Sequence, residues 1–105
     1  MSRDQVTKTA QRFIAEIKKN KIPFTKAYLF GSYAKGTAKK WSDIDICIIS
    51  DAFAGKKWDE NEKKLWRIRR NIDARIEPVG ISLKEFSSSS PLVSEIKSTG
   101  VLIAK

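Results

Sequence analysis

The sequence contains no histidine. A Ser-His-Asp triad, a histidine general base and a histidine-ligated metal are therefore excluded, and any catalysis must use carboxylates, Lys, Tyr, Ser or a bound metal ion. The single cysteine, Cys47, excludes an intrachain disulfide and a cysteine-cluster zinc site and is typical of a reducing compartment. Because Cys47 lies within an apolar run, we expect it to be a small buried hydrophobic residue.

Long apolar runs are also missing. No stretch approaches the roughly 20 residues of a transmembrane helix, and the polar start lacks the apolar region of a secretory signal, so we expect a cytoplasmic protein with no membrane contact. Three Pro, five Gly and 41% hydrophobic residues in a chain of 105 predict one compact domain over residues 1–105. Lys and Arg outnumber Asp and Glu by 21 to 12, and the resulting net charge of +9 predicts an anionic partner.

Helical and strand patterns alternate along the chain. Apolar residues at helical spacing predict a first helix over residues 4–20, with Ser2 or Asp4 as its N-cap. The β-branched run over residues 44–49 predicts a central strand that carries one carboxylate. The other expected elements are a strand over 27–30, a turn or short helix after it, a loop over 51–57, a helix over 58–72, a strand over 75–81, a serine-rich loop over 87–90, a helix over 91–98 and a strand over 101–103.

This alternation predicts an α/β fold with one small sheet covered by helices. Pro78 cannot donate a hydrogen bond to a neighbouring strand, so we expect its strand to lie at a sheet edge or to bulge there. The three tryptophans, Trp41, Trp58 and Trp66, are not spaced along one face, and we expect them to pack in the core or at its rim.

Asp43 and Asp45 are the most informative residues. Side chains two apart in a strand point to the same side, so these carboxylates share one face while Ile44 and Ile46 point to the core. Because adjacent carboxylates repel each other, such a pair is best tolerated around a hard divalent cation, first of all Mg²⁺. The turn Gly31-Ser32 offers backbone N–H groups and a hydroxyl to an anion. Each feature alone is common in solvated turns, and their combination is what indicates a site.

The segments Gly31-Ser32-Tyr33-Ala34-Lys35-Gly36 and Ser42-Asp43-Ile44-Asp45-Ile46 resemble the signature of the minimal nucleotidyltransferases of the DNA polymerase β superfamily, in which Gly-Ser, ten residues and Asp-x-Asp form the active-site core. The helices and strands expected around these segments follow the family's order. The resemblance implies a polymerase β-like nucleotidyltransferase fold with a small mixed sheet. It also implies an enzyme that uses ATP or another nucleoside triphosphate and transfers a nucleotide, AMP in the case of ATP, to a hydroxyl acceptor.

The same resemblance implies roles for six residues. These are Asp43, Asp45 and Glu77 as catalytic carboxylates that bind two Mg²⁺ ions, and Gly31, Ser32 and Gly36 as the turn that holds the phosphates. The third carboxylate of the family lies on the strand after the second helix, where Asp73 competes with Glu77. Strand alternation favours Glu77, because it lets this side chain leave the Ile76 face. Many family members have Asp at this position, so Glu77 followed by Pro78 departs from the pattern.

The length of the chain leaves no residues for the extra domains with which larger members hold nucleic acid, and nucleic acid is not favoured as a partner. The resemblance is to stand-alone members that act as the antitoxin of a toxin–antitoxin pair, where the acceptor would be a tyrosine of a small helical HEPN-domain protein. Two alternatives stay open, namely a binding module without catalysis and nucleotidyl transfer to a small molecule such as an aminoglycoside. Lys35, Lys39 and Lys40 either contact the triphosphate or are simply solvated. The basic helix face over residues 63–70 either docks an acidic partner or RNA or is solvated.

Overall fold

The computed structural model describes all residues from 1 to 105 and contains a four-stranded sheet in the order β3-β2-β1-β4. The strands are β1 (Lys26–Phe30), β2 (Ile44–Ile49), β3 (Ile76–Ile81) and β4 (Val101–Ala104). β1 is antiparallel to β2 and β4, whereas β2 and β3 are parallel, so the sheet is mixed. The expected α/β class is confirmed.

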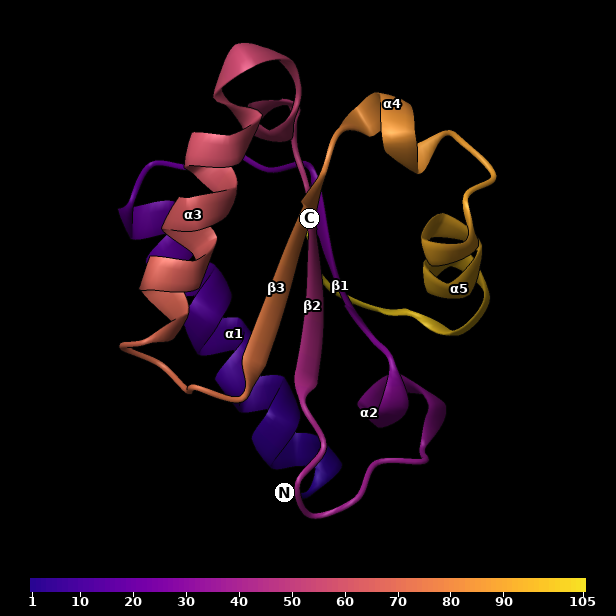
Figure 1. Ribbon diagram of the computed structural model, residues 1–105. Coiled ribbons are helices and arrows are strands. Elements are labelled where there is room, and N and C mark those ends of the chain that lie inside the picture. Colours follow the sequence, from indigo (N-terminus) through magenta and orange to yellow (C-terminus); the bar gives the residue numbers. More distant parts are fainter.

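Helices cover both faces of the sheet (Figure 1). They are α1 (Arg3–Lys19), α2 (Ser32–Lys35), α3 (Trp58–Arg69), α4 (Leu83–Phe86) and α5 (Pro91–Thr99), with two short 3-10 turns, η1 (Asp51–Phe53) and η2 (Gly55–Lys57). Figure 1 shows α1 and α3 on one side of the sheet and α4 and α5 on the other, with α2 near the lower end of β1. None of these helices has the length and apolar character needed to span a bilayer.

Local side-chain chemistry sets the starts of α1 and α5. Ser2 caps α1 with a capping box: its hydroxyl accepts a hydrogen bond from the Gln5 N–H at 3.1 Å, and Gln5 accepts one from the Ser2 N–H at 2.8 Å. Of the two expected caps, Ser2 is therefore the one used. At the start of α5, the Ser90 hydroxyl accepts a hydrogen bond from the Val93 N–H, and Pro91 occupies the first helical position as expected.

The sheet separates two apolar clusters. From β2, Ile44, Ile46 and Ile48 are fully buried on the side of α1 and α3, whereas Cys47 and Ile49 are buried on the side of α5. Cys47 is thus the buried hydrophobic residue expected, and its burial raises the pKa of the thiol to about 12. Strand alternation places Asp45 on the same face as Cys47, at the end of the α5 cluster.

β3 is an edge strand, as Pro78 predicts, and it pairs with β2 without a bulge. Its outer edge is covered by α3. The Gly80 N–H donates a hydrogen bond to the Glu62 carboxylate at 3.0 Å, and the Arg69 guanidinium donates to the Ile76 carbonyl at 3.5 Å. With Pro78 contributing no N–H, few backbone groups on this edge remain available to another chain.

Two sequence-based expectations need correction, and one short helix was not predicted. α3 ends at Arg69, not near Ile72, because the chain must turn there to enter β3; Ile72 still packs against the core from that turn. The short α4, capped by the Ser82 hydroxyl, was not expected, since four residues show no helical period. The tryptophans lie at the surface and not in the core. Their exposed fractions are 76% for Trp41, 54% for Trp58 and 37% for Trp66.

Candidate active site

The turn after β1 lies directly against Asp45. Phe30, the last residue of β1, is paired with Asp45 of β2, and Gly31 follows with a φ of 73°. A β-carbon on Gly31 would lie 2.1 Å from Oδ2 of Asp45, which is closer than any real contact. The backbone conformation of Gly31, with a φ of 73° and a ψ of −151°, suits glycine alone, and the missing side chain lets the backbone of the turn approach the carboxylate.

α2 extends this turn over a single helical turn. Ser32 is its first residue and is half-buried, and Gly36 ends it in the left-handed conformation with a φ of 79°, donating its N–H to the Ser32 carbonyl. No atom lies within 4 Å of a β-carbon built on Gly36, so a side chain would fit there. Glycine is favoured at this position because of the left-handed backbone conformation. The loop that follows leads back to the sheet at Asp43.

Three carboxylates lie near the start of β2 and β3. Asp43 directly precedes β2, Asp45 is its second residue, and Glu77 is the register partner of Asp45 on β3. Partial burial first, and then the charges of Glu77 and Asp43, raise the pKa of Asp45 to about 6. The pKa of Glu77 is raised by desolvation, by the charge of Asp43 and by a hydrogen bond between these two carboxyl groups.

Asp73, the competing third carboxylate, is engaged elsewhere. Its two oxygens accept hydrogen bonds from the Arg75 side chain at 3.1 and 2.8 Å, and one of them also accepts the Arg75 N–H at 2.8 Å. These hydrogen bonds lower the pKa of Asp73, which is the opposite of the shift at Glu77. The geometry therefore supports Glu77 as the carboxylate that accompanies Asp43 and Asp45.

The donor set suits a hard cation. Asp43, Asp45 and Glu77 offer only carboxylate oxygens, and none of them takes part in the four ion pairs of the structure. Burial first, and then the charges of neighbouring carboxylates, raise the pKa values of Asp45 and Glu77, and Mg²⁺ relieves such an excess of negative charge. No three acidic side chains converge tightly enough to form a finished ligand cluster, so the side chains would have to adjust around a cation.

A basic residue also reaches this site. Lys35, near the end of α2, forms an ion pair of 3.1 Å with Glu95 of α5, and the charges of both residues act on the pKa of Asp45. Sequence reasoning considered Lys35 but did not single out Glu95. Nothing in the sequence marks Glu95, because only the packing of α5 beside β1 brings it to the turn. Lys39 and Lys40 are exposed in the loop before Asp43 and form no ion pair.

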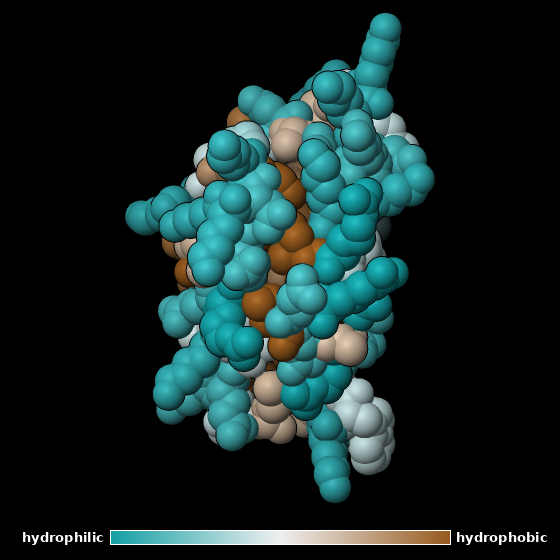
Figure 2. All heavy atoms as spheres, turned by 90° about the vertical axis from the view of Figure 1, so that its left-hand side faces the viewer, coloured by the Kyte–Doolittle hydropathy of each residue, from teal (hydrophilic) through white to brown (hydrophobic).

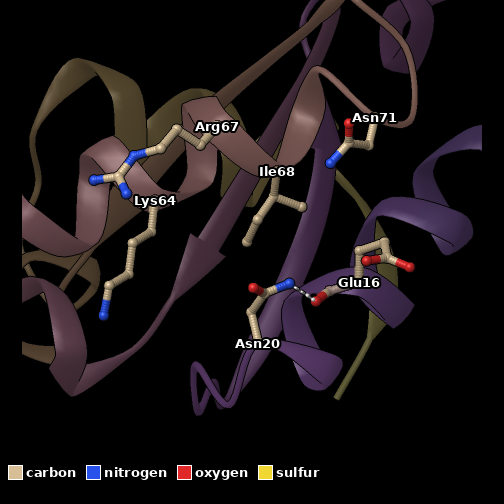
Figure 3. Close-up of a pocket in the computed structure, with 6 residues that line it drawn as sticks. All are labelled: Glu16, Asn20, Lys64, Arg67, Ile68 and Asn71. Carbon is tan, nitrogen blue, oxygen red and sulfur yellow. Dashed lines mark hydrogen bonds between the residues drawn. The ribbon is translucent and has the colours of Figure 1, made fainter.

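The pronounced hollows of the surface lie away from the carboxylates. Figure 2 shows a narrow hydrophobic strip bordered by hydrophilic side chains on the side of α1 and α3. A hollow of about 190 Å³ between these helices is lined by Glu16, Asn20, Lys64, Arg67, Ile68 and Asn71 (Figure 3). Within it, the Asn20 amide donates to the Glu16 backbone carbonyl at 2.8 Å. This hollow is on the opposite side of the sheet from Asp45, and Glu16 is the one carboxylate in its lining, so it does not coincide with the site predicted from the sequence.

The fold and the site together define a nucleotidyltransferase. A mixed sheet with a Gly-Ser turn at one strand end, and two or three carboxylates on the neighbouring strands, is the arrangement expected from the sequence signature. Residues 10–103 match the family model described as a nucleotidyltransferase domain, and the chain belongs to this family. The expected enzyme class is thereby confirmed. Comparison of the sequence with curated proteins gave no match.

Several solved structures share the fold. A toxin–antitoxin complex solved with AMP-PNP is 26% identical, with a TM-score of 0.62 over 88% of this chain and 70% of that chain. A nucleotidyltransferase from Sulfolobus solfataricus, described as putative, is 20% identical, with a TM-score of 0.65 over 95% and 80% of the two chains. A complex of a tri-AMPylated HEPN toxin from Shewanella oneidensis with its MNT antitoxin is 22% identical, with a TM-score of 0.61 over 97% and 71%.

Proposed function

We propose that the protein transfers AMP from ATP to a hydroxyl group of a HEPN-domain toxin and thereby acts as the antitoxin of the pair. The preferred acceptor is the hydroxyl group of a tyrosine. The observation that carries the proposal is the contact of the Gly31 turn with Asp45, which sets a phosphate-binding backbone beside the carboxylates Asp43 and Glu77. The structural similarity to toxin–antitoxin complexes, one of them solved with AMP-PNP and one with an AMPylated toxin, supports the choice of nucleotide and partner.

In the proposed reaction the acceptor oxygen attacks the α-phosphorus of ATP, the bond between the α-phosphorus and the bridging oxygen breaks, and pyrophosphate leaves. Ser32 and the backbone of the turn bind the β- and γ-phosphates, and Gly36 keeps the turn closed. Asp43, Asp45 and Glu77 would hold the divalent cations. Mg²⁺ bound there would neutralise phosphate charge and lower the pKa of the acceptor hydroxyl. Catalysis by this chain is then positioning and electrostatics, which agrees with the absence of histidine.

The acceptor surface is expected to come from the partner. The helices and strands of this chain are used to build and cover the small sheet, and none of the hollows that the structure contains is lined by the carboxylates. The net charge of +9 favours an acidic partner surface beside the site.

Two measurements test the proposal. Calorimetry with Mg²⁺ and ATP should show binding that the double variant Asp43→Asn and Asp45→Asn loses while it stays folded. Incubation with ATP, Mg²⁺ and a purified HEPN-domain partner should increase the partner's mass in steps of one AMP. A tight complex without any mass increase, with each of the four common nucleoside triphosphates, would favour the alternative of a binding module without catalysis.

A further inference from the structure

Lys35 and Glu95 form an unusual ion pair for this molecule. The other three ion pairs join residues two, three or four positions apart in the chain, whereas this pair joins α2 to α5 across 60 positions. Lys35 Nζ and Glu95 Oε1 are 3.1 Å apart, and the side chains are 42% and 35% exposed. The pair therefore ties the end of the Gly31 turn to the helix that covers the same face of the sheet as Asp45.

Glu95 adds a further negative charge near the carboxylates of the site. Glu95 lies within electrostatic reach of Asp45, which already experiences the charges of Asp43 and Glu77, and Lys35 is the basic group that opposes them there. A fourth carboxylate is tolerated at this place because Lys35 compensates it directly. A triphosphate bound to the turn would bring several further negative charges to the same lysine.

We propose that Glu95 is an internal competitor of the nucleotide: its carboxylate occupies Lys35 until the phosphate chain of the substrate displaces it. This inference rests on the proposed nucleotide site and adds a positioning and specificity residue to it. Displacement costs the Lys35–Glu95 ion pair and leaves Glu95 near like charges. A ligand with three phosphates compensates this cost better than a ligand with one, so the pair makes binding selective for triphosphates over the monophosphate.

Isosteric variants separate this role from a structural one. Glu95→Gln removes the competing charge with little change of shape, and we expect MgATP to bind about threefold to tenfold more tightly, with a smaller preference for ATP over AMP. Lys35→Gln should weaken MgATP binding at least about tenfold. In the double variant, Glu95→Gln should give no gain, because the lysine for which the two anions compete is missing. Calorimetry with ATP, AMP and inorganic tripolyphosphate measures each case.

Glu16→Gln is the matched control. Glu16 forms a comparable ion pair with Lys19, at 3.3 Å, on α1 and away from the carboxylates, so its loss should leave nucleotide affinity unchanged. Weaker MgATP binding by Glu95→Gln, or an equal gain with and without Lys35, overturns the competitor role while leaving the nucleotide site intact. If neither the wild-type protein nor Glu95→Gln binds MgATP, the proposed function fails as well.

Discussion

Gly31 and Asp45 lie so close together that a side chain on Gly31 cannot be accommodated without moving the Asp45 carboxylate. A methyl group on Gly31 would fall 2.1 Å from Oδ2 of Asp45, and the φ of 73° is unfavourable for alanine. We expect Gly31→Ala to cost about 2 kcal/mol of stability, from backbone strain and displacement of Asp45, and to abolish MgATP binding. Thermal denaturation and calorimetry measure the two effects.

Gly55→Ala provides the control for this substitution. Gly55 has nearly the same φ, 76°, but no atom lies within 4 Å of its virtual β-carbon. It should lose only the strain energy of a left-handed alanine, about 1 kcal/mol, and bind MgATP normally. Equal nucleotide affinities for the two variants would show that the contact with Asp45 has no part in binding.

The carboxylate cluster makes the stability of the protein pH-dependent when divalent cations are removed. The pKa of Asp45 is raised from 3.8 to about 6, so the folded state binds this proton more tightly than the unfolded chain does. The stabilisation by protonated Asp45 is present at low pH and lost as the pH rises through about 6. With EDTA, Asp45→Asn should therefore gain little at about pH 4 but about 1 kcal/mol at pH 7, after allowance for solvent screening, or roughly 4 °C in Tm.

Titrated unfolding of wild type and variant provides the measurement, and the difference between them isolates Asp45 from the other acids. A stability gain that is constant with pH would contradict the origin in ionisation. Added Mg²⁺ should reverse the ranking, because the wild-type protein alone would then gain the binding free energy of the cation.

Glu77→Gln and Asp73→Asn should affect different quantities. Glu77 faces Asp45 across the strands, and we expect Glu77→Gln to slow nucleotidyl transfer about 100-fold while changing MgATP affinity only severalfold. Asp73 instead holds Arg75, so Asp73→Asn should cost about 1 kcal/mol of stability and leave the transfer rate nearly unchanged. Single-turnover rates and denaturation curves check both expectations. The opposite distribution would make Asp73 the third carboxylate.

The covered edge of β3 can be tested through Glu62. Its carboxylate accepts the Gly80 N–H at 3.0 Å, and desolvation raises its pKa. Glu62→Ala should leave that N–H to water, cost about 1 kcal/mol and increase self-association. Glu62→Gln keeps an acceptor oxygen and should be close to wild type. Light scattering at increasing protein concentration and Tm measurements distinguish the two variants.

Much of the fold was predictable because local patterns and tertiary structure agree. The order of helices and strands, the edge position of Pro78 and the burial of Cys47 follow from periodicity and backbone chemistry, and the structure confirms them. The proximity of Gly31 to Asp45 was expected from the motif alone. The reason for this proximity is the pairing of Phe30 with Asp45, which is set by the register of β1 and β2 in the sheet.

Other features depend on contacts that a single sequence does not encode locally. The ion pair of Glu95 with Lys35 joins residues 60 positions apart and requires the packing of α5. The exposure of Trp41 was not predicted, because aromatic residues are usually favourable in a core. The residues around Trp41 have no pattern that places their loop at the surface.

The position of β4 has a consequence for the folding pathway. β1 and β2 pair between residues only 15 to 23 apart, whereas Ala27 of β1 pairs with Ala104 of β4. Closing the longer loop costs more chain entropy, so the pairing of β4 with β1 should follow that of β1 with β2. Until β4 docks, the second edge of β1 stays open, and a chain at that stage is more prone to aggregation there than the native protein is at the covered edge of β3.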